Sequence, residues 1–379
     1  MDRRVFLRCI GCGAAAAAIA ESGLLPDAAG MMANVYAFDL SSKLSSVEAR
    51  HYKRLEGGGI ECGICPRHCR VTDLERGYCG VRENHADTYV TLVYGLPCAL
   101  NIDPIEKKPL FHFYPGSKAL SLATAGCNVN CKFCQNWDIS QSRPEQTPNM
   151  DLPPAQVVQL AVERGTPILA YTYSEPTVFF EYMYDCARAG QDRALKSVMI
   201  SGGYIEKDTL ADLLPHLDAI KIDLKSIRED YYKNIVGGEL KPVLDRLVQI
   251  KSAGKWLEIV NLVVPTLNDS EADFHQMASW IMTNLGPDVP IHFSQFYPKY
   301  LLKNLPPTPQ GTLELAHDIA KSEGLHYVYL GNLPGHPAES TYCPGCEATV
   351  IGRRGFLVYE NNLVGNKCAK CQYVIPGVF

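Results

Sequence analysis

From residue 118 onward the sequence alternates short apolar runs with amphipathic stretches, and this alternation constrains the fold more than any other feature. The apolar runs lie at 119–123, 168–173, 197–201, 219–224, 257–264, 291–296 and 327–330. Between them, apolar residues recur at helical spacing in 154–164, 178–189, 207–217, 240–253, 272–285 and 310–322. Such alternation predicts parallel strands with right-handed crossovers, in an open or closed barrel. We therefore expect an α/β core over residues 118–335.

Three cysteines follow the first apolar run, where the chemistry of such folds is found. Cys127, Cys131 and Cys134 form a C-x3-C-x2-C pattern after Gly126. Three thiolates leave a four-coordinate metal centre one ligand short, whereas closed structural sites use four protein ligands. The spacing predicts a metal centre with an open position; a chance triple of cysteines and a zinc-binding loop are the alternatives that the spacing alone leaves open.

With Phe133 before the third cysteine, this stretch resembles the radical S-adenosylmethionine (SAM) superfamily. The resemblance implies a partial (β/α)6 TIM-like barrel and a [4Fe-4S] cluster on the three cysteines. It also implies that the open iron binds the amino and carboxylate groups of S-adenosylmethionine, and that an electron from the cluster cleaves the sulfonium to give a 5′-deoxyadenosyl radical.

The end of the second apolar run resembles a cofactor-binding element of that family. Its Glu175-Pro176 aligns with the Gly-Gly-Glu-Pro element that binds the amino group of S-adenosylmethionine, although Tyr173 and Ser174 replace the two glycines. Glu175 is the amine-binding candidate. A carboxylate that caps the next helix is the alternative.

Other strand ends supply further candidates for cofactor contacts. Asp223 and Lys225 resemble the Asp-x-Lys element of glycyl-radical activating enzymes, and alternation places both on one strand face. Lys225 would pair with the methionyl carboxylate, with Asp223 orienting it or holding a monovalent cation; a surface ion pair is the alternative for Asp223. Ser201, His292 and Asn332 are further candidates, and a structural role for the histidine stays open.

Two more cysteine sets have metal-binding spacing. Cys343, Cys346, Cys368 and Cys371 form two C-x2-C pairs separated by 21 residues. This spacing predicts a zinc ribbon, with rubredoxin-like iron as the alternative. Nearer the front, the set Cys62, Cys65, Cys69 and Cys79 fits either zinc or an auxiliary iron–sulfur cluster. Cys98 and Cys186 lack partners at metal spacing and are expected to pack.

The composition limits the classes of partner. The 36 basic and 41 acidic residues give a formal charge of −5, with no long basic run, so a nucleic-acid partner is not expected. Eleven of the 13 cysteines beyond the first dozen residues fall into the three metal-like sets, which favours metal sites over a disulfide framework.

The sequence divides into four predicted parts. Residues 1–34 resemble a twin-arginine export leader, with a soluble helical leader as the alternative. A four-cysteine accessory domain over 35–117, the core and a zinc-ribbon tail over 336–379 follow. The leader suggests export with only transient membrane contact, whereas the supply of S-adenosylmethionine and reductant favours the cytoplasm.

Nearly all of the chain after the leader resembles the radical enzyme of the AmmeMemoRadiSam system, a relative of pyruvate formate-lyase activating enzyme. The shared stretches include 103–110, 134–137 and 171–177. The resemblance implies hydrogen abstraction from an unidentified substrate, with Memo-like and Ammecr-like partners and a low-potential reductant such as flavodoxin or ferredoxin. A glycyl-radical activating enzyme and a non-catalytic iron–sulfur carrier or adaptor are the alternatives.

Overall fold

The computed structural model describes residue 41 and residues 43–379, so the predicted leader over residues 1–34 lies outside the described residues. The described residues contain no helix that could span a membrane.

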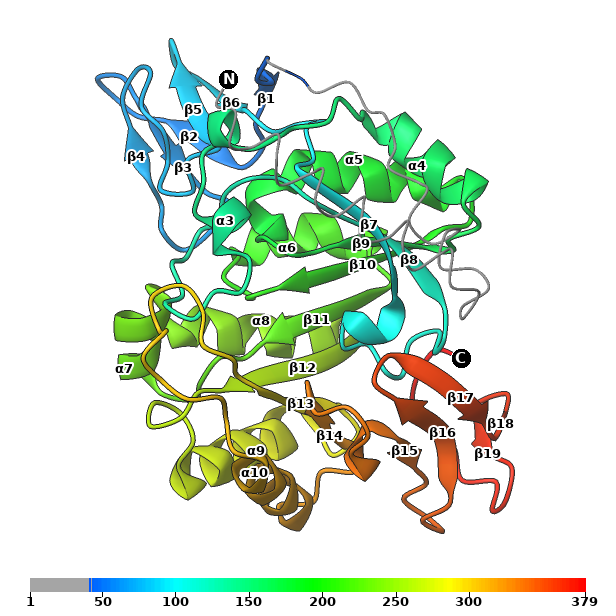
Figure 1. The fold of residues 1–379 in the computed structure, drawn as a ribbon. Coiled ribbons are helices and arrows are strands. Elements are labelled where there is room, and N and C mark those ends of the chain that lie inside the picture. The colour runs from blue at the N-terminus through cyan, green and yellow to red at the C-terminus, as the bar shows by residue number, and fades with distance from the viewer. Residues whose placement is uncertain (1–40, 42) are drawn as a thin grey trace, which may run out of the picture. The chain divides into compact units, whose positions relative to one another are not determined.

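An eight-stranded sheet forms the centre of the fold (Figure 1). The strands lie side by side in chain order: β7 (Ala99–Pro104), β8 (Lys118–Ala123), β9 (Ile168–Tyr171), β10 (Lys196–Ser201), β11 (Ala219–Asp223), β12 (Trp256–Val263), β13 (Ile291–Gln295) and β14 (Val328–Gly331). Strands β8 to β14 are parallel, and β7 runs antiparallel to β8 at one edge. Because β7 and β14 are the two edges, the sheet of the described residues is open.

Helices connect the parallel strands as the periodicity predicts. The larger ones are α4 (Pro154–Glu163), α5 (Phe180–Gln191), α6 (Lys207–Leu213), α8 (Leu240–Ser252), α9 (Glu271–Leu285) and α10 (Gln310–Ser322). Local signals set their bounds: Ser270 Oγ accepts a hydrogen bond from Asp273 N at the start of α9, and Gly286 ends that helix with φ +88°. The predicted α/β core is therefore confirmed, as six strand–helix units followed by β14.

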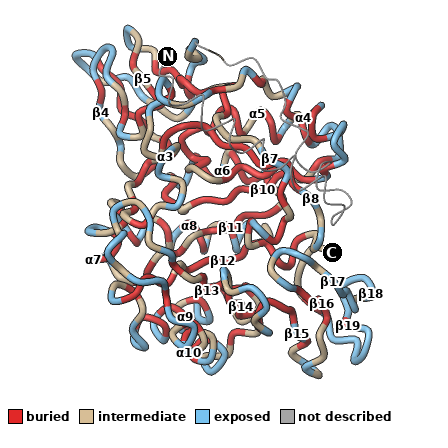
Figure 2. Tube along the Cα trace, in the orientation of Figure 1, coloured by how far each residue is buried: buried red, intermediate tan, exposed pale blue. Residues whose placement is uncertain are grey.

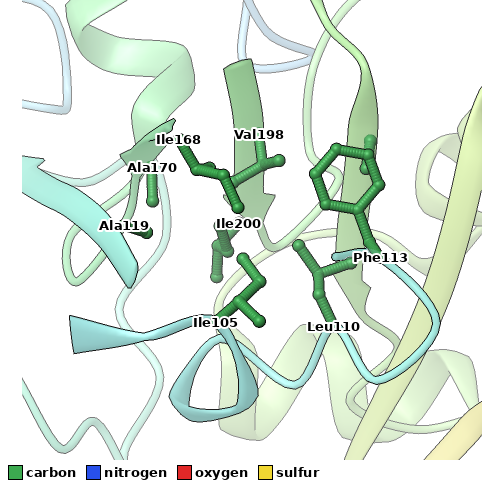
Figure 3. Close-up of a cluster of buried hydrophobic side chains, with 9 residues drawn as sticks. Ile105, Leu110, Phe113, Ala119, Ile168, Ala170, Val198 and Ile200 are labelled. Atoms are coloured by element: carbon green, nitrogen blue, oxygen red, sulfur yellow. The ribbon is translucent and has the colours of Figure 1, made fainter. Parts of the chain in front are cut away.

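The segment after β7 closes the amino-terminal end of the parallel strands. Because Pro104 of β7 pairs with Lys118, the first residue of β8, the chain leaves β7 at that end of the sheet. Residues 105–113, here called the basal segment, then place Ile105, Leu110 and Phe113 in a buried cluster (Figure 3). Their partners come from the parallel strands: Ala119, Ile168, Ala170, Val198, Ile200 and Ala219.

The four-cysteine segment before β7 forms two small antiparallel sheets. One contains β2 (Tyr52–Arg54), β3 (Ile60–Cys62) and β4 (Arg70–Val71), and the other contains β1 (Val47–Glu48), β6 (Thr88–Thr91) and β5 (Arg82–His85). The fully buried Arg82 of β5 pairs with the buried Glu181 of α5. Strand β7, predicted as part of this accessory domain, instead completes the sheet of the core.

The C-terminal segment is built of short antiparallel strands. These are β15 (Thr341–Tyr342), β16 (Thr349–Arg354), β17 (Leu357–Asn361), β18 (Leu363–Val364) and β19 (Lys367–Cys368). A hairpin through Gly355 joins β16 to β17, and the glycine supplies the positive φ of +59° at its turn. Figure 2 shows that strands at the centre of the large sheet are mostly buried, whereas β17 and β18 are largely exposed.

Candidate functional site

A cavity of about 490 Å³ lies at the carboxyl ends of the parallel strands. Its walls come from the loop after β8, from residues of β10 to β13, from the residues that follow β9, β10, β11 and β14, and from residues 107–109 of the basal segment. This volume is in the range of small-molecule sites. The three cysteines of the C-x3-C-x2-C pattern, Cys127, Cys131 and Cys134, all line this cavity.

Backbone contacts hold the cysteine loop. Asn130 N and Lys132 N donate to the carbonyl oxygens of Val236 and Ile235, both at 3.0 Å. Gly126 precedes the first thiol with φ +94°, and a Cβ there would lie 2.7 Å from the Cys79 carbonyl oxygen, so only glycine fits. The loop is therefore fixed against two other parts of the chain before any metal binds.

The thiols suit a bound cation. Burial raises the pKa of the Cys131 thiol to about 12 and holds that of Cys127 well above its usual range. Buried thiolates need a positive charge beside them, which a metal centre supplies. Three thiols that line one cavity thus fit a three-cysteine [4Fe-4S] cluster, which Cys127, Cys131 and Cys134 would hold.

Glu175 projects a fixed carboxylate into this cavity. Oε1 accepts hydrogen bonds from Thr177 N (3.1 Å), Thr177 Oγ1 (2.8 Å) and Ser201 Oγ (2.6 Å), and Oε2 accepts from Gly202 N (2.9 Å). The side chain caps the short 3-10 helix Pro176–Phe179, as the alternative reading proposed, and lines the cavity as well. No lysine or arginine forms an ion pair with it within the described residues, so its charge is available to a ligand ammonium.

The residue that replaces the first glycine of the family element keeps a glycine-like backbone. Tyr173 has φ +63°, the left-handed region that costs an L-residue about 1–2 kcal/mol. Its carbonyl oxygen accepts from Asn136 Nδ2 at 2.8 Å, and its hydroxyl donates to Asp103. These contacts at both ends of the residue hold a conformation that glycine would adopt freely.

Asp223 and Lys225 come together as alternation predicts. Lys225 Nζ lies 3.4 Å from Asp223 Oδ2, and Lys221, two residues earlier on the same face of β11, bonds to Oδ1. Burial alone would raise the pKa of Asp223, but the two ammonium groups hold it below its usual value. Lys225 Nζ also lies 5.6 Å from the ring centroid of Phe133, beside the cysteine loop.

Of the remaining candidates, Ser201 and Asn332 line the cavity and His292 does not. The imidazole of His292 is 1% exposed, and its Nε2 lies 2.8 Å from Glu258 Oε2. The same Glu258 carboxylate accepts hydrogen bonds from backbone N–H groups of the basal segment. Ser294, two residues along the same face of β13, lines the cavity where His292 was expected. The structure therefore assigns His292 to the core packing.

The cavity residues that sequence reasoning missed include Lys108, Lys221 and Ser294. Alternation along β11 and β13 would have indicated Lys221 and Ser294, because each shares a face with a residue that had been identified. No local pattern would have indicated Lys108, since it reaches the cavity from the basal segment, outside the strand–helix units.

The C-terminal cysteines form a compact four-thiol group. The Sγ atoms of Cys343, Cys346, Cys368 and Cys371 all lie within 4.8 Å of one another, with 3.4 Å between Cys343 and Cys371. Zinc–sulfur bonds of about 2.3 Å in a tetrahedron place sulfur atoms roughly 3.8 Å apart, so the group fits a closed metal site. Which metal it binds stays a prediction.

The N-terminal set is less compact. In the part of the chain that the structure describes, the 4.8 Å spacing is met by the C-terminal set alone. Cys62, Cys65, Cys69 and Cys79 do share one small region, where Cys62 N donates to the Cys69 carbonyl oxygen at 2.9 Å. Zinc or an iron–sulfur cluster there stays a prediction. Cys186 is fully buried in α5 and Cys98 is partly buried, as expected of packing residues.

Known proteins resemble this chain. The profile of the Radical SAM superfamily matches residues 121–281, which include the cysteine loop, Glu175 and Lys225. An uncharacterized protein of Methanocaldococcus jannaschii is 45% identical over 316 residues, 83% of this chain and 94% of that protein. The pyruvate formate-lyase-activating enzyme of Clostridium pasteurianum is 23% identical over 159 residues, 41% of this chain and 66% of that enzyme.

Among solved structures, SuiB of Streptococcus suis aligns with a TM-score of 0.46 and 12% identity, over 60% of this chain and 52% of SuiB. The profile match and the similarity to an activating enzyme agree with the cysteine loop and the mostly parallel sheet. The chain belongs to the radical SAM superfamily and is an enzyme of that type, which implies a [4Fe-4S] cluster and S-adenosylmethionine as its cofactors.

Proposed function

We propose that this enzyme cleaves S-adenosylmethionine reductively and abstracts hydrogen from a substrate handled by an AmmeMemoRadiSam-type system. The observation that carries the proposal is the shared cavity: three cysteine thiols and the carboxylate of Glu175 line the same space. A non-catalytic carrier has no need of a carboxylate aligned by four hydrogen bonds beside the thiols.

Different residues of the cavity bind the cluster and the charged groups of S-adenosylmethionine. Cys127, Cys131 and Cys134 hold the cluster, which supplies the electron that cleaves the cofactor. Glu175 accepts the ammonium of S-adenosylmethionine, because its carboxylate faces the cavity without a cationic partner among the described residues. Lys225, held by Asp223, binds the carboxylate of the cofactor. Ser201 orients Glu175 through its hydroxyl.

The partners in this proposal are those that the resemblance to the AmmeMemoRadiSam-system enzyme implies. A low-potential reductant such as flavodoxin or ferredoxin supplies the electron, and Memo-like and Ammecr-like proteins act on the same substrate. The C-terminal four-thiol group binds zinc and stabilises a segment whose outer strands are too exposed to fold by burial alone.

Activation of a glycyl-radical protein is a second candidate function. The similarity to the pyruvate formate-lyase-activating enzyme of Clostridium pasteurianum favours it. In this case the substrate is a backbone glycine of a partner protein and the product is a stable protein radical.

The test is anaerobic reconstitution with iron and sulfide, followed by S-adenosylmethionine and dithionite, with mass detection of 5′-deoxyadenosine. We expect formation by the intact protein and none by a variant with alanine at all three cluster cysteines. Stimulation by Memo-like and Ammecr-like proteins supports the first function, whereas a glycyl-radical signal in an added partner supports the second. A fully cluster-loaded protein that forms no 5′-deoxyadenosine contradicts both.

A further inference from the structure

Lys108 is a buried cation that the contacts assigned to S-adenosylmethionine do not use. Its side chain is 2% exposed, yet it lines the same cavity as the cluster cysteines. It belongs to the basal segment and therefore enters from the amino-terminal end of the parallel strands, whereas the cysteine loop lies at their carboxyl ends. The ammonium thus forms part of the floor of the cavity.

The contacts of Lys108 leave donors available. Nζ donates to Asp103 Oδ2 at 2.6 Å and lies 4.2 Å from the ring centroid of Tyr173. An ammonium has three N–H donors, and Asp103 is its acceptor among the described residues, so two donors remain for a ligand. Asp103 also accepts from Lys107 Nζ at 2.9 Å, so its single negative charge is shared between two lysines.

Charged side chains of both signs surround the cavity. Lys107, Lys108, Lys221 and Lys225 lie around it, with Asp103, Asp223 and Glu175. In the proposed function Glu175 pairs with the ammonium of S-adenosylmethionine and Lys225 with its carboxylate, so Lys107 and Lys108 are left to share Asp103. Burial lowers the pKa of Lys108 to about 8, and the hydrogen bond to Asp103 opposes this shift.

We propose that Lys108 binds an anionic oxygen group of the substrate, a carboxylate or a phosphate, so that the enzyme acts on a small acid. This inference rests on the proposed function and narrows the class of substrate. The ammonium is a compact charge that suits either anion. The anion would compensate the buried positive charge of Lys108, which Asp103 neutralises only in part because Asp103 also pairs with Lys107. An anionic group bound to Lys108 at the floor of the cavity would leave the rest of the substrate nearer the cysteine loop, where S-adenosylmethionine is proposed to bind.

The test is calorimetric titration of the cluster-loaded, S-adenosylmethionine-bound protein with acetate and, separately, with inorganic phosphate. We expect millimolar binding of at least one anion, with the tighter of the two identifying the group. Lys108→Gln should weaken that binding at least tenfold. Lys118→Gln, which removes an exposed lysine from the start of β8, should leave it within twofold. The melting temperature and cluster absorbance of each variant verify that it is folded and loaded.

Two results would overturn the inference: neither anion binds, or Lys108→Gln binds as the unmodified protein does. If 5′-deoxyadenosine is still formed in either case, only the anion site is wrong. If the unmodified protein forms none, the proposed function fails whatever the titration gives.

Discussion

Replacement of Glu175 by glutamine should weaken S-adenosylmethionine binding without loss of the cluster. The variant keeps the size of the side chain but removes the negative charge that faces the ligand ammonium. A hydrogen bond to a charged group is worth about 1.5–3 kcal/mol, and each 1.4 kcal/mol is a factor of ten in Kd. The loss should therefore be roughly 10- to 100-fold.

The surroundings of Glu175 enlarge this effect. All four of its protein hydrogen bonds come from donors: Thr177 N, Thr177 Oγ1, Ser201 Oγ and Gly202 N. A glutamine must turn its amide N–H₂ either toward these donors or toward the ligand ammonium, and both arrangements are unfavourable. Ser201→Ala removes one of these donors and keeps the negative charge of Glu175, so it should weaken the binding free energy of S-adenosylmethionine by only about 0.5–1.5 kcal/mol.

The assay is anaerobic calorimetry with S-adenosylmethionine on protein of verified iron content. Glu163→Gln, an exposed position at the end of α4, is the matched control and should bind as the unmodified protein does. If folded, cluster-loaded Glu175→Gln also binds with unchanged affinity, the assignment of Glu175 to the cofactor ammonium is refuted.

Two further predictions concern stability and metal content. Burial lowers the pKa of His112 to about 4 from 6.5. The unfolded chain therefore takes up this proton at higher pH than the folded one, so His112 should lower the free energy of unfolding by about 2 kcal/mol between pH 7 and pH 5. Chemical denaturation at the two pH values should show a smaller decrease in stability for His112→Gln, and an equal decrease would contradict this. Cys346→Ser should abolish stoichiometric metal binding at the C-terminal four-thiol group and lower the melting temperature, whereas Cys98→Ser should do neither. Mass spectrometry of the bound metals and thermal unfolding measure the two effects. Full metal retention by Cys346→Ser would contradict the proposed metal site.

The strand–helix core could be predicted from the sequence because its signal is local and repeated. Each parallel strand is buried on both sides and reads as an apolar run, as β9 shows with four buried residues from Ile168 to Tyr171. The helices between them carry their own periodicity. The residues near the ends of these strands are then expected to share one edge of the sheet, and all of the candidates there except His292 line one cavity.

Strand β7 and the basal segment could not be predicted in this way. Their positions depend on pairing with β8 and on packing inside the sheet, which no periodicity of the segment itself reports. Lys108 was missed for that reason, although its sequence neighbourhood was noted. The strand alternation that joined Asp223 to Lys225 also contains Lys221, so this residue was within reach of sequence reasoning.

His292 shows the limit of strand-end reasoning. His292 was expected to contact the cofactor because it lies on a late strand, but it meets Glu258 outside the cavity, and Ser294 on the same strand face lines the cavity instead. Depth along a strand depends on how the strands are staggered, which tertiary pairing sets. The positive φ of Tyr173 was equally hidden, because the contacts that hold it come from Asp103 and Asn136.

The central claim is that the three thiols of the cysteine loop hold a cluster whose open iron meets S-adenosylmethionine in the cavity. Electron paramagnetic resonance of the reduced, reconstituted protein before and after addition of S-adenosylmethionine tests it most directly, with Cys131→Ala as the comparison. We predict a reduced-cluster signal that changes when S-adenosylmethionine is added, and its loss in Cys131→Ala. A signal that S-adenosylmethionine leaves unchanged, or that persists in Cys131→Ala, would contradict the account.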